Sequence, residues 1–212
     1  MKELGKNTFI FEFEDALSKE FCSELIDYFE NKAPDKHKGQ SVIKGKDGQK
    51  DVICKDSTSK VSIDCHIVPK RSEKEKYFDD VMFQACYDGL QKLEKYVYQW
   101  PHLELSYTGF QVQKSEVNKG KFEPHCDHNR EIFTERQVAV IFYLNDVEEA
   151  GTTDFLNFNE KVKPEAGKMV FFPTSWPWLH AGVVPKSNDK YIVTTFFVRH
   201  NLQKKVYDAA RF

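Results

Sequence analysis

The chain of 212 residues carries 31 lysines and arginines against 33 aspartates and glutamates, a formal net charge of -2. This near balance gives no general electrostatic case for nucleic acid or an anionic membrane as a partner. The length suits one hydrophobic core, so we expect a single domain over residues 1–212. The sequence MKELGKNTFIFEFED lacks the apolar region of a signal peptide, and no run of about 18 apolar residues predicts a membrane span, so we expect a cytoplasmic protein.

The cysteines are odd in number and scattered, with no CxxC spacing. They are Cys22, Cys54, Cys65, Cys86 and Cys126. This pattern indicates neither a disulfide framework nor a zinc ribbon, and reduced thiols fit it best. A bridge from Cys54 to Cys65 across a hairpin remains an alternative.

Two helices are predicted in the first half of the chain. TFIFEF (8–13) reads as a short strand, and Ser18 then stands at an N-cap position before apolar residues at helical spacing, which end before Pro34. A second strand is predicted at 61–68. From Ser72 to Trp100, apolar residues recur every three to four positions, which predicts a long amphipathic helix whose stripe belongs to the core.

Residues 35–60 are rich in Lys, Asp, Gly and Ser, and they predict a mobile loop with a weak strand at 52–54. Loops of this kind often cover active sites. A solvated excursion without function is the equally weighted alternative.

Short β-like runs separated by turns fill the chain from Pro101 to about residue 200. Seven or eight antiparallel strands behind two helices predict a mainly β, α+β fold, in which a jelly-roll (double-stranded β-helix) carries the N-terminal helices on one sheet. RQVAVIFYL (136–144) is apolar on both faces, as a central covered strand should be. We divide the chain into a support region (1–103), a core (104–200) and a tail (201–212).

His125 and Asp127 lie two apart in the predicted strand KFEPHCD (121–127), so their side chains are expected to point the same way. About 0.5 His-x-Asp pairs would arise by chance in this composition, and His102-Leu103-Glu104 is a similar pattern in poorer context. The mixed nitrogen and oxygen set of a non-haem Fe(II) site needs one more histidine. We predict that His180 supplies it.

Lys190 opens the strand KYIVTTFFV, in which Ile192, Thr194 and Phe196 share its face. If that face points inward, the lysine and threonine form an anion-binding pocket. A buried lysine is costly unless it is paired, so a carboxylate partner is then expected. The alternative places Lys190 at an exposed strand start beside Asp189.

These residues together, with RQVAVIFYLNDVEEAGTTDF and KPEAGKMVFFP, resemble the Fe(II)/2-oxoglutarate-dependent dioxygenases of the prolyl 4-hydroxylase type. The resemblance runs from about Gly109 to Val198. It implies a hydroxylase that converts 2-oxoglutarate and O2 to succinate while hydroxylating an unactivated carbon, with ascorbate as a possible reductant. A peptidyl residue, proline favoured, or a small metabolite is the implied substrate, and the oligomeric state stays open.

The resemblance implies that His125, Asp127 and His180 bind iron. Lys190 would pair with the far carboxylate of 2-oxoglutarate, with Thr194 as a hydrogen-bonding neighbour. Arg136 matches an arginine at the start of a strand in the family and is expected to shape the site, with a surface role as the alternative.

Two positions depart from the family pattern. Ser115 stands where these hydroxylases usually carry a tyrosine that contacts the cosubstrate, and Phe196 stands where they often have a tryptophan. Both changes touch the pocket and weaken a claim for peptidyl proline. Because Lys190 is present, we still expect the protein to use 2-oxoglutarate as a cosubstrate. We expect Ser115 to make a weaker contact with the cosubstrate than the usual tyrosine.

Aromatic residues precede His180 in the run Trp176-Pro177-Trp178. They could stack on a substrate, with Trp178 in the pocket, or lie against the core, and we favour the core. Cys126, between two predicted ligands, should point to the opposite face and belong to the core.

Two other functions remain open. The first is a non-catalytic binding module on the same fold with a dead or differently metallated site. The second is a nucleic-acid dealkylating dioxygenase, but those relatives usually hold the cosubstrate with arginines after the distal histidine. Here Lys190 stands in that place and no phosphate-binding patch is evident, so nucleic acid is not the expected partner.

Overall fold

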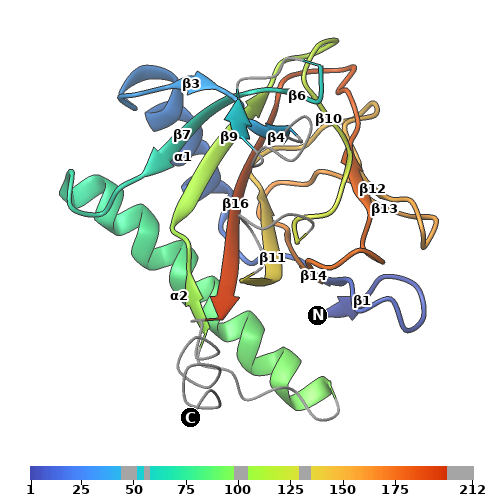
Figure 1. Cartoon of the computed structure of the whole chain (residues 1–212). Helices are drawn as coiled ribbons and strands as arrows, with labels where there is room; N and C mark the ends of the chain where they lie inside the picture. The colour runs from blue at the N-terminus through green and yellow to red at the C-terminus, as the bar shows by residue number, and fades with distance from the viewer. Residues whose placement is uncertain (44–51, 55–57, 98–104, 129–134, 200–212) are drawn as a thin grey trace, which may run out of the picture.

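The computed structural model describes residues 1–43, 52–54, 58–97, 105–128 and 135–199. Two antiparallel β-sheets face each other, and two helices cover the outer face of the larger sheet (Figure 1). The fold is mainly β, as predicted, with the helices grouped on one sheet of a jelly-roll. Within the described residues, no helix is long and apolar enough to span a membrane.

The larger sheet has nine strands, in the order β1-β2-β14-β11-β16-β9-β7-β3, with β8 paired to β16. Their bounds are β1 (Lys2–Glu3), β2 (Phe11–Phe13), β3 (His37–Lys38), β7 (Ile63–Ile67), β8 (Leu105–Tyr107), β9 (Phe110–Ser115), β11 (Arg136–Tyr143), β14 (Met169–Pro173) and β16 (Lys190–Arg199). The apolar strand β11 lies between β14 and β16, which confirms its predicted central place.

The smaller sheet has five strands, in the order β13-β12-β15-β10-β6. They are β6 (Lys60–Val61), β10 (Lys121–His125), β12 (Thr153–Phe155), β13 (Glu160–Val162) and β15 (His180–Gly182). A separate pair joins β4 (Ser41–Ile43) and β5 (Val52–Cys54). Strand β10 ends at His125, so the alternation expected through Asp127 stops two residues earlier than predicted.

Both helices begin at the predicted serines. Helix α1 (Lys19–Asn31) follows Ser18, whose side chain accepts a hydrogen bond from the backbone N–H of Phe21 at 3.1 Å. Helix α2 (Glu73–Tyr96) follows Ser72, which caps Glu75 in the same way. Capping of this kind satisfies backbone donors that the first turn leaves free.

Two hydrophobic clusters lie on opposite faces of the larger sheet. The outer cluster packs α1 and α2 on the sheet, and Phe78 and Met82 of α2 are fully buried in it. Tyr77, an apolar position of the predicted helix, is 44% exposed and packs at the edge of this cluster against Phe21 and Phe78. The inner cluster lies between the sheets and includes Tyr143 and Phe155.

The described parts of the segment 35–60 contain more β-structure than was predicted. Where it is described, it contains β3, β4 and β5, and β5 confirms the weak strand at 52–54. Strand β6 begins at Lys60 and pairs with β10, so this segment is tied to both sheets. Cys65 is a free thiol, which excludes the bridge to Cys54. The predicted tail and His102 lie outside the described residues.

Candidate metal centre and active site

His125 and His180 face each other across two neighbouring strands. They are paired in the antiparallel register of β10 and β15, and their ring centroids are 4.3 Å apart. Residues 55 positions apart in the sequence are therefore brought together by one strand pairing. The register shifts between Phe122 and His125, which marks an irregularity in β10 just before the site.

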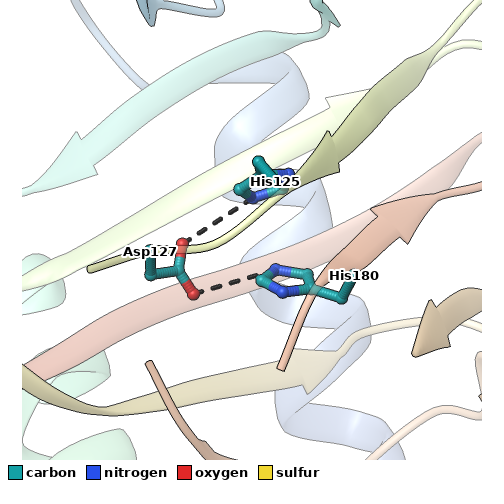
Figure 2. A group of neighbouring side chains, drawn as sticks. All are labelled: His125, Asp127 and His180. Atoms are coloured by element: carbon teal, nitrogen blue, oxygen red, sulfur yellow. Dashed lines mark ion pairs between the residues drawn. The ribbon is translucent and has the colours of Figure 1, made fainter. Parts of the chain in front are cut away.

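Asp127 lies beyond the end of β10, and its carboxylate reaches back between the two imidazoles (Figure 2). Oδ1 is 3.7 Å from Nε2 of His125, and Oδ2 is 3.7 Å from Nε2 of His180. One donor atom from each residue lies within 4.8 Å of the others. The convergence predicted from the sequence is present, although a bend and not strand alternation places Asp127.

Backbone carbonyls fix the orientation of both rings. Nδ1 of His125 lies 2.8 Å from the carbonyl oxygen of Glu123, and Nδ1 of His180 lies 3.0 Å from that of Trp178. A carbonyl oxygen only accepts, so Nδ1 of each ring is the donor, and Nε2 of each ring is the atom turned toward the carboxylate of Asp127. Burial, followed by the charge of His180, lowers the pKa of His125 well below its usual value, which keeps this ring neutral.

Two imidazoles and one carboxylate on one face are the donor set that suits non-haem Fe(II) with open positions. The carbonyl partners of Nδ1 are the outer hydrogen bonds that typically orient metal-binding histidines. The residues present therefore fit a divalent metal. Among the described residues, this is the one group of three or more metal-ligating side chains that lies close enough to bind a single ion.

Aromatic rings enclose the two histidines. Phe122 stacks on His125 with ring centroids 3.6 Å apart and planes 23° from parallel. Phe172 and Phe155 lie around His180 at centroid distances of 4.8 and 5.7 Å. These rings hold the imidazoles in place and keep water away from them on those sides.

A cavity of about 510 Å³ extends from the three residues between the sheets. Lys190 lines it and is 3 % exposed, so the alternative of an exposed strand start is wrong. Its Nζ donates a hydrogen bond to the carbonyl oxygen of Gly151 at 2.7 Å. Burial lowers the pKa of Lys190 to about 8. No carboxylate of the described residues forms an ion pair with it, so an anion entering the cavity would find an ammonium ready to bind.

The other predicted pocket residues of β16 share the face of Lys190. Ile192, Thr194 and Phe196 all line the cavity. The side chain of Thr194 accepts a hydrogen bond from Nε2 of Gln113 at 2.9 Å. Ser115 is paired with Lys190 across β9 and β16, and it too lines the cavity.

Arg136 lines the cavity, and its guanidinium carbon lies 3.6 Å from the ring centroid of Phe196. Burial lowers its pKa to about 10, while the charge of Asp127 acts in the opposite direction. The surface alternative for this arginine is therefore wrong.

Trp178 lies against the core, the favoured interpretation, and not in the pocket: it packs at the edge of the inner cluster and donates from Nε1 to the carbonyl oxygen of Thr8 at 2.7 Å. Two other predictions near the site need correction. Trp176 is not in the core, because it is 77 % exposed. Cys126 is not in the core either: it lines the cavity and donates from Sγ to the carbonyl oxygen of Trp176 at 3.4 Å. Since β10 stops at His125, strand alternation does not reach Cys126.

Sequence reasoning missed several polar residues of the cavity wall, among them Lys60 and Gln113. Gln113 lies two residues before Ser115 in β9, so strand alternation places both side chains on the same face. Its place in the cavity could therefore have been predicted from that of Ser115. Lys60 lies in the segment predicted as a loop, and nothing in its spacing pointed to the site.

Residues 110–198 match the family model described as the 2OG-Fe(II) oxygenase superfamily. This segment is similar in sequence to that superfamily. The match contains His125, Asp127, His180 and Lys190, while Lys60 lies outside it. Among curated proteins, none matches the sequence closely enough to count as a relative.

Several solved structures share the fold. A viral collagen prolyl hydroxylase from Paramecium Bursaria Chlorella virus-1, solved with 2OG, superposes with a TM-score of 0.66 at 19% identity, covering 92% of this chain and 98% of that one. A Pseudomonas putida prolyl-4-hydroxylase gives 0.62 at 17% identity, with coverage of 92% and 95%. A prolyl hydroxylase from Trichoplax adhaerens, bound to a hypoxia inducible factor peptide fragment, gives 0.65 at 14% identity, with coverage of 91% and 84%. The fold is thus that of the prolyl hydroxylases.

Proposed function

We propose that the protein is an Fe(II)- and 2-oxoglutarate-dependent dioxygenase that hydroxylates an unactivated C–H bond. The observation that carries this proposal is the convergence of His125, Asp127 and His180 at a cavity that also holds the buried ammonium of Lys190. The superfamily of residues 110–198 supports the same cofactor and cosubstrate. We further propose that residues 1–212 work as one domain, since the related folds are matched over nearly their whole length.

The three donor residues would hold Fe(II) through Nε2 of His125, Nε2 of His180 and the carboxylate of Asp127. When bound, the iron with 2-oxoglutarate and O2 supplies the oxidising chemistry, with ascorbate as a candidate reductant, and the chain supplies position and environment. The carbonyls of Glu123 and Trp178 accept from Nδ1 of the two rings, which would direct both Nε2 atoms toward the metal.

Lys190 would bind the far carboxylate of 2-oxoglutarate. A charge-assisted hydrogen bond is strong at a buried position, and the carboxylate would offset the cost of burying this ammonium. Ser115 and Thr194 line the same part of the cavity and would add hydrogen bonds. Ile192 and Phe196 form the apolar part of that wall and exclude water from the bound cosubstrate.

The substrate would be a peptidyl residue, with proline favoured, or a small metabolite. Prolyl hydroxylases with the same fold, one of them solved with a peptide, favour the first. Ser115 and Phe196 at the positions of the usual tyrosine and tryptophan favour a changed pocket. Arg136, stacked on Phe196 at the cavity wall, would contact the substrate side of the site.

Turnover of the cosubstrate tests the proposal. Protein purified without oxygen and loaded with Fe(II) should convert 2-oxoglutarate to succinate when O2 is admitted, slowly even without a substrate. His125→Ala should abolish both iron binding and succinate formation. His37→Ala removes a histidine that does not line the cavity and should change neither. The proposal fails if the wild type neither binds iron nor forms succinate, or if His125→Ala changes nothing.

A further inference from the structure

A second buried lysine lines the cavity. Lys60 opens β6 in the smaller sheet and is 6 % exposed. It lies outside residues 110–198, so the family match assigns it no part. The proposed binding of 2-oxoglutarate uses Lys190 and leaves the second ammonium without a role.

The ammonium of Lys60 is held in one position. Nζ donates to Oδ2 of Asp64 at 2.7 Å, and the hydroxyl of Ser62 donates to Oδ1 of the same carboxylate at 2.7 Å. Gly39 packs against the stem of the lysine, because a Cβ there would lie 3.2 Å from both Cδ and Cε. Asp64 is buried and does not line the cavity, so it presents Lys60 to the cavity without itself facing a ligand.

The position is beside the proposed iron site. Lys60 is the cross-strand partner of Phe122, and Nζ lies 5.4 Å from the centroid of that ring. His125 stacks on the same Phe122 ring, with centroids 3.6 Å apart. The ammonium and a proposed iron ligand therefore both contact one aromatic ring.

Lys60 and Lys190 serve different parts of the cavity. Asp64, which fixes Lys60, is paired with Gln113 of β9, and Gln113 is paired with Ile192 of β16. Lys190 lies two residues before Ile192 on the same face of β16 and is paired with Ser115. The ammonium of Lys60 is thus bound to a residue of β7, which lies on the opposite side of β9 from the strand that carries Lys190.

The hydrogen-bonding capacity of Lys60 is incompletely used. An ammonium has three donors, and within the described part of the chain Nζ has one hydrogen-bond acceptor, Asp64. A charged group that is buried this deeply needs further hydrogen-bond acceptors, and a ligand in the cavity can supply them.

We propose that Lys60 determines substrate specificity by binding a carboxylate of the substrate beside the iron site. The inference rests on the proposed function and adds the chemical class of the substrate, a carboxylate-bearing molecule. The carboxylate could belong to a free acid, such as an amino acid, or to an acidic side chain of a peptide. A purely structural link between the sheets is the competing account of the ion pair.

Acetate, the smallest carboxylate probe, tests the site in protein loaded with Zn(II) and saturated with 2-oxoglutarate. We expect a saturable shift of the Lys60 ε-carbon signal in 13C-lysine-labelled protein, at concentrations up to roughly 100 mM. Lys60→Met should weaken acetate binding about tenfold or more and leave the Kd of 2-oxoglutarate within about twofold. Lys121→Met removes a more exposed lysine of the same cavity and is the matched control, with no effect on either.

Three results would overturn the inference. The first is that acetate does not shift the Lys60 ε-carbon signal in protein that binds Zn(II) and 2-oxoglutarate. This result would leave the proposed function intact. The second is a loss of 2-oxoglutarate binding in Lys60→Met equal to that in Lys190→Met, which would assign Lys60 to the cosubstrate. The third is a lowered Tm in Lys60→Met with unchanged acetate binding, which would leave only a structural ion pair. If Zn(II) or 2-oxoglutarate does not bind at all, it is the proposed function that fails.

The source of the carboxylate can then be identified by turnover. A free amino acid such as L-proline, compared with its amide, which lacks the carboxylate, represents one source, and a peptide with a glutamate beside proline represents the other. The inference is supported if either carboxylate compound stimulates succinate formation by the wild type and Lys60→Met abolishes this stimulation. The inference is contradicted if the variant is stimulated as much as the wild type.

Discussion

Lys190 lies opposite Ser115 in the register of β9 and β16, and its Nζ donates to the carbonyl oxygen of Gly151 at 2.7 Å. The small serine leaves the buried ammonium open to the cavity, where a tyrosine would extend over it. This pairing places a cation at one end of the cavity and the two histidines of β10 and β15 at another part of its wall.

The first prediction concerns Lys190→Met. We expect the Kd of 2-oxoglutarate to rise about 100-fold, because a buried charge-assisted hydrogen bond is lost while metal binding is kept. The variant should be no less stable than the wild type, since it removes a buried cation without an anionic partner. Calorimetry measures the first effect and thermal unfolding the second. Lys186→Met, an exposed lysine, is the matched control; equal 2-oxoglutarate affinity in both variants would contradict the assignment.

The second prediction is a pH dependence set by Lys190. Its pKa is about 8 in the folded protein and close to 10.5 when exposed, so between these values the unfolded chain binds more protons. The contribution of this group to the free energy of unfolding therefore rises with pH from about 8 to 10.5 and is least favourable below 8. Lys190→Met should lack this rise. Chemical unfolding at several pH values, wild type against variant, checks the sign; parallel curves would refute it.

The third prediction concerns Gly120, which packs on the backbone of Ser115. A Cβ at this position would lie 2.4 Å from the Cα of Ser115, an impossible distance without movement of β9. Gly120→Ala should destabilise the protein by about 1–3 kcal/mol and weaken 2-oxoglutarate binding by displacing Ser115. Gly182→Ala is a control on the same cavity, because its Cβ would meet Phe122 at an ordinary 3.4 Å. Similar losses of stability in the two variants would argue against the close packing.

The fourth prediction separates the two tryptophans. Trp178→Phe loses the hydrogen bond to Thr8 and should lower stability by about 1 kcal/mol without changing the affinity for 2-oxoglutarate. Trp176→Phe, at an exposed position, should change neither quantity. Thermal unfolding and calorimetry of both variants provide the comparison. If Trp178→Phe lost cosubstrate binding and kept normal stability, Trp178 would have to be assigned to the pocket.

The features predicted well from sequence are those set by local chemistry. Ser18 and Ser72 cap their helices because a serine before an amphipathic run satisfies free backbone donors. The apolar pattern of β11 predicted a central strand, and the shared face of Lys190, Ile192, Thr194 and Phe196 followed from strand alternation.

The features that sequence did not predict depend on how distant segments meet. The pairing of His125 with His180 is a matter of register between β10 and β15, which spacing along the chain does not define. Cys126 was misplaced because β10 ends one residue earlier, and the choice between core and pocket for Trp178 is decided by a partner near the N-terminus, Thr8. Lys60 reaches the cavity only through the pairing of β6 with β10.

The central claim is that His125, Asp127, His180 and Lys190 form one site for iron and 2-oxoglutarate. Calorimetric titration of 2-oxoglutarate into protein loaded with an inert divalent metal tests it most directly. We predict binding of one equivalent that requires the metal and is lost in Asp127→Ala and in Lys190→Met. Absence of binding in metal-loaded wild-type protein, or binding that both variants retain, would contradict the claim and favour a non-catalytic module on this fold.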